Sequence, residues 1–143
     1  MMEVIQLSGT DKKLYEKVAP LVMNPTVIQY NQNYPFKTNE KFIWFIALID
    51  SEVVGFMPVE LRKSQWIINN YYVTPSKEES IVFSTLLQAI NQAYNTHLTA
   101  IVQTKHQNHF SIQGFTIAKE WKKYLKMEKK EEDNKNGTAK KCI

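Results

Sequence analysis

Apolar and polar residues alternate along MEVIQL, residues 2–7, and this pattern predicts a first β-strand. Leu14 and Val18 then have helical spacing, which predicts a helix that Pro20 should end or kink. In the stretch FIWFIALIDSEVVGFMPVELR, two apolar runs flank the turn residues Asp50-Ser51-Glu52. This arrangement is typical of a β-hairpin, and the run WIINNYYV after it predicts a third strand of the same meander.

The second half of the chain predicts further helices and strands. A helix is expected from about residue 77 to 94, because one stripe holds its apolar residues Val82, Leu86, Ile90 and Ala93. LTAIVQ predicts a buried strand, HQNHFSIQGF a short helix ending at Gly114, and FTIA and WKKYLKM a final strand pair. We therefore expect one α/β domain over residues 1–128, with a single mixed, mostly antiparallel sheet flanked by helices.

Composition narrows the class of protein. The chain has 143 residues, of which 43% are hydrophobic, which is enough for one domain with a proper core. No apolar stretch is long enough to span a membrane, and the N-terminus lacks the layout of a signal peptide, so we expect a cytoplasmic protein. The single cysteine, Cys142, allows no internal disulfide.

The formal charge of +4 raises the question of nucleic-acid binding. Six lysines and four acids lie between Lys126 and the C-terminus, so half of this charge belongs to the end of the chain. Residues 129–143 are charged and almost free of apolar residues, and we expect this tail to be disordered. In the rest of the chain, positive and negative charges are nearly equal in number. This part has one arginine, Arg62, whereas proteins that bind nucleic-acid phosphates usually have several. We therefore expect neither a nucleic-acid nor a membrane partner.

Several short stretches occur in an order that is characteristic of one enzyme family. FIALIDSEVVGFMPVEL has Val-Gly-Phe after its turn, and YYVTP has a valine two residues before a proline. A leucine pair, Leu86-Leu87, follows in the helix, and IQGFTIAKEWKKYLKM supplies a Gly-Phe strand and a last strand with a tyrosine and a methionine. With these features, residues 42–127 resemble the GNAT superfamily of N-acetyltransferases. The resemblance implies the acyl-CoA N-acyltransferase fold and transfer of an acetyl group from acetyl-CoA to an amine.

The segment that would hold the cofactor departs from the family's pattern. Family members usually have Arg/Gln-x-x-Gly-x-Gly/Ala after the proline, and its glycines let backbone N–H groups close on the pyrophosphate of acetyl-CoA. In this chain those positions hold Glu78, Ile81 and Phe83. Ser76 and Glu79 instead fit a capping box, and acids in the first turn of a helix repel a pyrophosphate. This segment therefore predicts a self-capped structural helix and makes acetyl-CoA a doubtful substrate.

The resemblance also implies binding residues. Backbone groups of Tyr71, Tyr72 and Val73 would hold the thioester and the pantetheine of acetyl-CoA. The long loop over residues 24–38, with a turn of helix near its middle, would receive the acceptor through Tyr30, Asn31 and Tyr34. Aromatic and amide side chains suit a neutral or cationic acceptor, although these tyrosines could instead only cover the sheet.

Catalytic residues are less well marked. Many family members have a tyrosine four residues before the Gly-Phe as the acid for the CoA thiolate, but this chain has Phe110, which has no proton to give. Its neighbour His109 is a candidate replacement. Asn70 can orient a water molecule where the family often places its general base. Glu60 is the nearest carboxylate, although a charge facing solvent at a strand end also explains it.

His106 and His109 have i, i+3 spacing, but no third ligand is near them in the sequence, so we expect no metal site.

The sequence leaves two functions open. In the first hypothesis, the protein is an acetyl-CoA-dependent N-acetyltransferase with an altered cofactor loop and an unidentified amine acceptor. In the second, it is a catalytically inactive module of the same fold that binds a small molecule or a protein partner. An open cleft between Val73 and the strand LTAIVQ would favour the enzyme, and a filled one the binding module.

Overall fold

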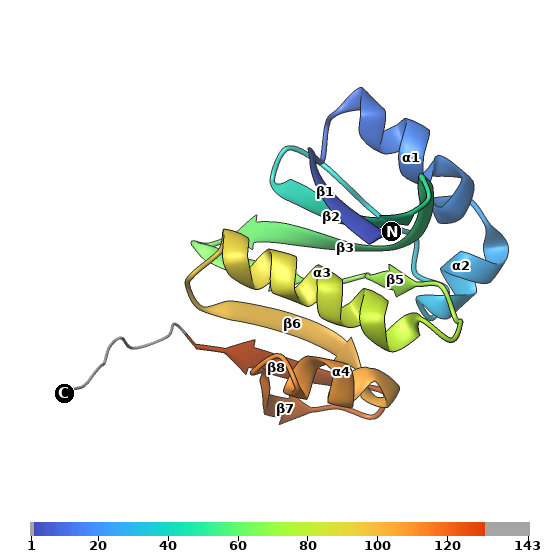
Figure 1. Cartoon of the computed structure of the whole chain (residues 1–143). Helices are drawn as coiled ribbons and strands as arrows, with labels where there is room; N and C mark the ends of the chain where they lie inside the picture. The colour runs from blue at the N-terminus through green and yellow to red at the C-terminus, as the bar shows by residue number, and fades with distance from the viewer. Residues whose placement is uncertain (1, 131–143) are drawn as a thin grey trace.

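The computed structural model describes residues 2–130 as one sheet with helices on both faces (Figure 1). Most of the tail expected to be disordered, residues 131–143, lies outside the described residues. The strands are β1 (Met2–Ser8), β2 (Phe42–Ile49), β3 (Glu52–Arg62), β4 (Gln65–Ile68), β5 (Tyr72–Val73), β6 (Leu98–Gln103), β7 (Thr116–Glu120) and β8 (Tyr124–Lys129). The helices are α1 (Lys12–Val22), α2 (Pro25–Tyr30), α3 (Glu79–Ala93) and α4 (Gln107–Ser111), with a 3-10 turn η1 (Thr104–His106) before α4.

The strand order is β1-β2-β3-β4-β6-β8-β7, and neighbouring strands are antiparallel except for β4 and β6. This confirms the predicted fold class, a mixed and mostly antiparallel sheet flanked by helices. The first hairpins turn at Asp50-Ser51 and Lys63-Ser64, and all four of these residues have positive φ. Two-residue turns of this kind match the right-handed twist of the strands, so the turn residues set the β2-β3-β4 meander.

The run WIINNYYV does not form the continuous strand that its apolar pattern predicts. β4 ends at Ile68, and Asn70 has a φ of 57°, a conformation that asparagine adopts more readily than most residues. After this break, β5 pairs with β3 through Tyr72, whereas β4 pairs with β6 up to Ile68. β5 therefore diverges from the end of β6. The resulting gap lies where the resemblance places the acetyl-CoA thioester.

Alternation along the strands divides the core into two clusters. The larger cluster lies beneath α3 and α4 and includes Phe45, Met57, Phe83, Leu86 and Phe110. The smaller cluster lies beneath α1 and α2 and consists of Leu14, Val18, Val27, Trp44, Ile46, Leu48, Phe56 and Tyr72. The buried strand residues of this smaller cluster come from β2, β3 and β5, and Ile5 and Leu7 of β1 pack against it. The same face of β4, β6 and β8 carries a cavity instead of a helix.

Some helix ends differ from those predicted. Pro20 does not end α1, which continues to Val22 with Leu14 buried against the sheet. α3 begins at Glu79, two residues later than expected, and Ala93 at its end is exposed. Gly114 has a φ of 97°, the left-handed conformation predicted after the short helix.

No helix within residues 2–130 is long and apolar enough to cross a membrane.

Candidate functional site

The gap between β5 and β6 is bordered by the three residues that the resemblance assigns to acetyl-CoA. Their side chains are buried, with Tyr71 2%, Tyr72 7% and Val73 0% exposed. Tyr71 and Val73 belong to the cluster beneath α3, whereas Tyr72 belongs to the cluster beneath α1 and α2. One edge of this backbone pairs with β3, so only its other edge faces β6 and any ligand in the gap.

The side chain of Tyr71 crosses this gap. Its hydroxyl oxygen accepts a hydrogen bond from the backbone N–H of Gln103 at the end of β6, with 3.0 Å between nitrogen and oxygen. The same hydroxyl lies 2.6 Å from Nδ1 of His106, and we assign its proton to that contact. Burial raises the pKa of Tyr71, and the hydrogen bond from Gln103 partly offsets the rise. Tyr71 thus takes the place of a partner strand beside the end of β6.

His106 links the two tyrosines that meet in the gap. With Nδ1 as the acceptor, the neutral ring carries its proton on Nε2, which lies 3.4 Å from the hydroxyl of Tyr30. Burial, and then the charges of Lys105 and His109, lower the pKa of His106 to about 4, so the ring is neutral at pH 7. Both ring nitrogens therefore have partners. No group of three potential metal ligands among His, Cys, Asp and Glu occurs in the described part of the chain.

Tyr30 closes the gap from the side of α2. Burial raises the pKa of Tyr30, and a hydrogen bond from the backbone of Val73 to its hydroxyl partly offsets the rise. Its ring packs edge-on against Tyr72, with 4.8 Å between ring centroids. Its carbonyl oxygen accepts a hydrogen bond from Gln103 Nε2 at 2.9 Å. The Val73 backbone, which the resemblance assigns to the thioester, therefore already contacts a tyrosine hydroxyl.

The other two predicted acceptor residues, Asn31 and Tyr34, have different surroundings. Asn31 is 4% exposed, and its Nδ2 donates to the carbonyl oxygen of Tyr34 and to Oδ1 of Asn70, both at 3.0 Å. These contacts tie the loop after α2 to the break after β4. The side chain of Tyr34 is 65% exposed. Asn31 is thus occupied with holding the loop, and Tyr34 faces solvent.

Phe83 fills the gap from the side of α3. It is fully buried, and its ring stacks on that of His109 with 4.3 Å between centroids and 6° between planes. The Phe83 centroid also lies 5.1 Å from that of His106 and 5.7 Å from that of Tyr71. Ile81 is 58% exposed and leaves the gap clear. Phe83 stands at the second small-residue position of the family's loop, so a bulky replacement there helps to close the gap.

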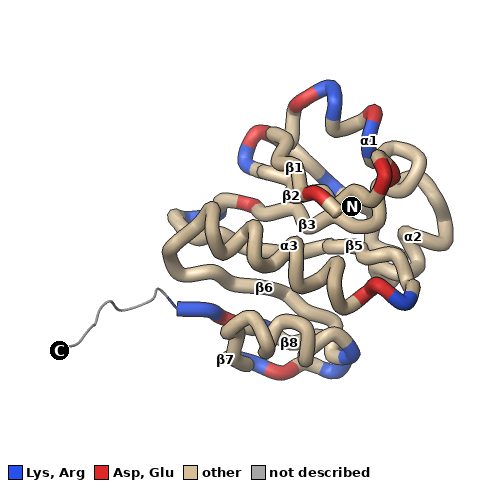
Figure 2. Tube along the Cα trace, viewed as in Figure 1, with Lys and Arg blue, Asp and Glu red and all other residues tan. Residues whose placement is uncertain are grey.

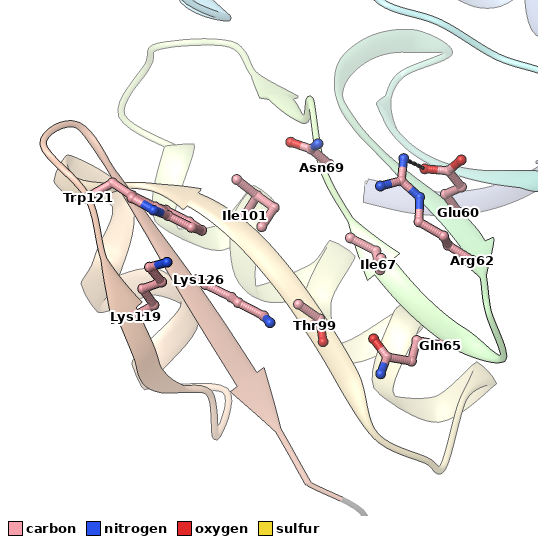
Figure 3. Close-up of a pocket in the computed structure, with 10 residues that line it drawn as sticks. All are labelled: Glu60, Arg62, Gln65, Ile67, Asn69, Thr99, Ile101, Lys119, Trp121 and Lys126. Carbon is pink, nitrogen blue, oxygen red and sulfur yellow. Dashed lines mark hydrogen bonds and ion pairs between the residues drawn. The ribbon is translucent and has the colours of Figure 1, made fainter.

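A separate cavity of about 330 Å³ lies on the sheet face opposite α3 (Figure 3). We call this part of the sheet, formed by β4, β6 and β8, the open face. The cavity lies over Ile67 of β4 and over Thr99 and Ile101 of β6, with Lys126 of β8 and Trp121 beside them. None of these five residues was predicted from the sequence to form a site. Period-two alternation places residues of one strand on a common face, but it does not reveal that this face lacks a covering helix.

Comparisons with known proteins concern the fold. No protein-family model matches the chain, and no curated protein sequence matches it significantly. Among solved structures, ElaA from Escherichia coli is 15% identical, with a TM-score of 0.67 over 91% of this chain and 100% of that one. The aminoglycoside 6'-N-acetyltransferase from Enterococcus faecium is 12% identical, with a TM-score of 0.66 over 90% of this chain and 96% of that one. The N-acetyltransferase PseH from Campylobacter jejuni, in complex with acetyl coenzyme A, is 12% identical, with a TM-score of 0.58 over 92% of this chain and 100% of that one.

This chain has the GNAT fold. The fold that the resemblance implies is thereby confirmed. At 12–15% identity the likeness establishes the fold, whereas any reaction depends on the residues of the site.

The start of α3, where the GNAT resemblance places the pyrophosphate, lacks the capping box that the sequence predicts. Ser76 Oγ accepts a hydrogen bond from the N–H of Glu78 at 3.1 Å, and the Ser76 carbonyl oxygen accepts one from the N–H of Glu79 at 3.3 Å. Glu78 is the N-cap residue, so Ser76 lies two residues too early to cap the helix, and no side chain caps it. Acidic residues still mark this helix start (Figure 2), and the charge of Glu79 contributes to the raised pKa of Tyr30.

The three catalytic candidates have separate surroundings in this GNAT fold. Glu60 lines the cavity on the open face and pairs with Arg62 at 3.1 Å. Asn70 accepts the hydrogen bond of Asn31, and His109 stacks on an aromatic ring of α3. Within residues 2–130, no hydrogen bond joins any two of the three candidates. Their catalytic roles stay predictions.

Proposed function

We propose that this chain is a ligand-binding module with the GNAT fold and that it does not transfer an acetyl group from acetyl-CoA. The proposal rests mainly on one observation: the side chain of Tyr71 crosses the gap, and its hydroxyl is hydrogen-bonded to the Gln103 N–H and to Nδ1 of His106. The residues present do not fit the thioester and pantetheine that the resemblance assigns to this gap. The cavity on the open face supplies the ligand site.

Acetyl-CoA would have to displace two tyrosines to enter the gap. If Tyr71 moves, the buried Gln103 N–H and Nδ1 of His106 both lose their hydrogen-bond partner. Each buried group that the incoming cofactor does not satisfy costs about 1–3 kcal/mol, or roughly a 5- to 150-fold loss of affinity. Tyr30 would also have to leave the backbone of Val73.

The start of α3 adds an electrostatic cost. Because the charge of Glu79 acts on Tyr30 in the gap, it would also act on a pyrophosphate bound at this helix start. Two unit charges about 5 Å apart repel by roughly 3 kcal/mol at an effective dielectric constant of 20. The helix dipole offers a surface anion only about 0.3–1 kcal/mol. Repulsion therefore exceeds attraction for a phosphate beside Glu79.

One observation favours a second candidate, an N-acetyltransferase with an unidentified amine acceptor. The backbone N–H groups of Ser80 and Ile81 donate to no acceptor among the described residues, and such groups at a helix start can hold an anion. Two of the solved neighbours, the aminoglycoside-modifying protein and PseH, bear the names of acetyltransferases. For this reaction, Tyr30 and Tyr71 would have to move before acetyl-CoA binds.

Calorimetric titration with acetyl-CoA and with free CoA separates the two candidates. The proposal predicts no binding heat for the unmodified chain at millimolar cofactor. Tyr30→Ala removes one of the rings that close the gap, and a gain of binding in this variant would identify the closed gap as the barrier. Thermal melts of both samples confirm that they are folded. Micromolar binding by the unmodified chain, together with acetylation of an amine from a panel of polyamines and aminoglycosides, would overturn the proposal.

A further inference from the structure

We infer that the cavity on the open face binds a small planar carboxylate, of the class of aromatic and heteroaromatic acids. The inference rests on the proposed function, because it names the ligand class of the cavity that the binding module would use. Its basis is an excess of positive charge beside an exposed tryptophan, in a cavity of about 330 Å³ that suits a small molecule.

Two lysines lie directly opposite each other at the border of this cavity. In the β7–β8 ladder, Ile117 pairs with Met127, and the register then shifts so that Lys119 pairs with Lys126. Without the shift, Ala118 would lie opposite Lys126, and Lys119 would face the other side of the sheet. The β-bulge therefore brings a second ammonium group to the cavity, and bulges are known to re-aim side chains next to binding sites.

The two lysines give the cavity unbalanced positive charge. Like charges directly opposite each other in a ladder destabilise a sheet. Within residues 2–130, neither Lys119 nor Lys126 pairs with a carboxylate. Glu60, the one acid that lines the cavity, already pairs with Arg62 at 3.1 Å. The lining thus has two positive charges in excess, and Lys126 is only partly exposed to solvent. A bound anion would relieve the repulsion between the lysines.

Trp121 offers this anion a flat partner. Its side chain is 44% exposed and lines the cavity, and Nζ of Lys119 lies 5.4 Å from the indole centroid. Figure 3 shows the Trp121 ring next to Ile101, with the Lys126 side chain extending toward Thr99. An aromatic ring can stack on the indole and on the aliphatic floor. Its carboxylate would then lie between the two ammonium groups.

The same features disfavour two other ligand classes. An amine, the acceptor that the GNAT resemblance implies, would meet net positive charge, because Glu60 is already paired. A phosphate has three strong acceptor oxygens, and although lysine also binds it, it is held best by several donors, such as a bidentate arginine or the N–H groups of a helix start. The only arginine here, Arg62, is engaged by Glu60, and the lining residues belong to strands and to segments directly after them. A carboxylate needs no more than the two lysines.

NMR titration of the full chain with benzoate and with indole-3-acetate tests the inference, with benzamide as the uncharged control. We expect saturable shifts of the Trp121 indole N–H and of the Thr99 and Lys126 amides with both acids. Benzamide should bind about tenfold more weakly or worse, because it lacks the charge-assisted hydrogen bond. Equal affinities of benzoate and benzamide, or shifts confined to other residues, would overturn the inference. This readout requires no variant.

Substitutions then locate the site. Lys119→Gln and Lys126→Gln each remove one positive charge from the cavity, and Lys122→Gln removes one from an exposed position outside it. The first two should weaken benzoate binding about tenfold, and the third less than twofold. Lys119→Gln should also raise the melting temperature of the ligand-free protein, which distinguishes lost binding from lost folding. Unchanged benzoate affinity in both cavity variants would overturn the inference.

Titration of the same unmodified sample with acetyl-CoA distinguishes a failure of this inference from a failure of the proposed function. Binding of the acids without binding of acetyl-CoA supports both. If neither binds, the carboxylate class is wrong, and the absence of acetyl transfer still stands. Micromolar binding of acetyl-CoA overturns the proposed function and, with it, the basis on which the ligand class was assigned.

Discussion

Replacement of Tyr71 by phenylalanine removes one oxygen atom from the gap between β5 and β6. That oxygen accepts a hydrogen bond from the Gln103 N–H at 3.0 Å and lies 2.6 Å from Nδ1 of His106. Tyr71 is 2% exposed and both partners are 4% exposed, so water has little access to the groups left behind. Each buried polar group without a partner costs about 1–3 kcal/mol. Tyr71→Phe leaves two such groups and should therefore lower the free energy of unfolding by roughly 2–6 kcal/mol.

Tyr72→Phe is the matched control for this prediction. Tyr72 is the next residue and 7% exposed, and no hydrogen bond of its hydroxyl is found in the described part of the chain. Its replacement should change the free energy of unfolding by less than about 0.5 kcal/mol. Chemical denaturation followed by far-UV circular dichroism measures both variants. Equal effects would refute the reasoning, because closure of the gap would then not depend on the Tyr71 hydroxyl.

Other predictions concern protonation, charge and close packing. The pKa of His106 is lowered to about 4 from an ordinary value of 6.5, so the unfolded chain takes up the proton first. The contribution of His106 to stability is thus complete above about pH 6.5 and is lost as the pH falls toward 4. Unfolding free energies measured from pH 7 to pH 4.5 should depend less on pH in His106→Gln, and an identical dependence would count against a buried neutral ring. Lys119→Gln should raise the unfolding free energy of the ligand-free protein by roughly 0.2–1 kcal/mol in a denaturant titration, whereas a decrease would contradict the repulsion across the β7–β8 ladder. Gly55→Ala should cost about 1–3 kcal/mol in the same assay, because its new Cβ would lie 3.0 Å from both the Tyr72 carbonyl oxygen and Val82 Cγ1; a neutral result would show that β3, β5 and α3 pack less closely.

The sheet was largely predictable because its signals are local. Alternation along MEVIQL and the turn residues Asp50-Ser51 act over a few positions, and the structure has a strand and a two-residue turn there. The left-handed conformation of Gly114 followed from its place after a short helix in the same way. The capping box at Ser76 failed because the helix begins at Glu79, and sequence patterns place helix ends only within a few residues.

The closed gap was less predictable because it depends on residues far apart in the chain. Tyr71 could be placed on a strand, but nothing local shows that its hydroxyl reaches Gln103. The contact of Tyr30 with His106 joins residues that lie even farther apart in the sequence. Phe83 was the one local signal, since a bulky residue occupied a position that the family usually gives to a small one.

The cavity depended on features that period-two alternation does not contain. Alternation assigns Thr99 and Lys126 each to one face of its strand, but it does not show that the cluster beneath α1 and α2 ends before β4, β6 and β8. The register shift before Lys119 is also invisible in the apolar pattern of β7, whose five residues are all exposed. These features appear only when the strands are paired.

The most direct test of the closed gap follows the backbone amide signals of Val73 and Gln103 by NMR while acetyl-CoA is added to the full chain. The Gln103 N–H donates to the Tyr71 hydroxyl, and the Val73 backbone contacts the Tyr30 hydroxyl. If the tyrosines keep these places, both signals should stay unchanged up to millimolar acetyl-CoA. Saturable shifts of both signals at micromolar acetyl-CoA would contradict the account, because the cofactor would then enter the gap that the two tyrosines fill.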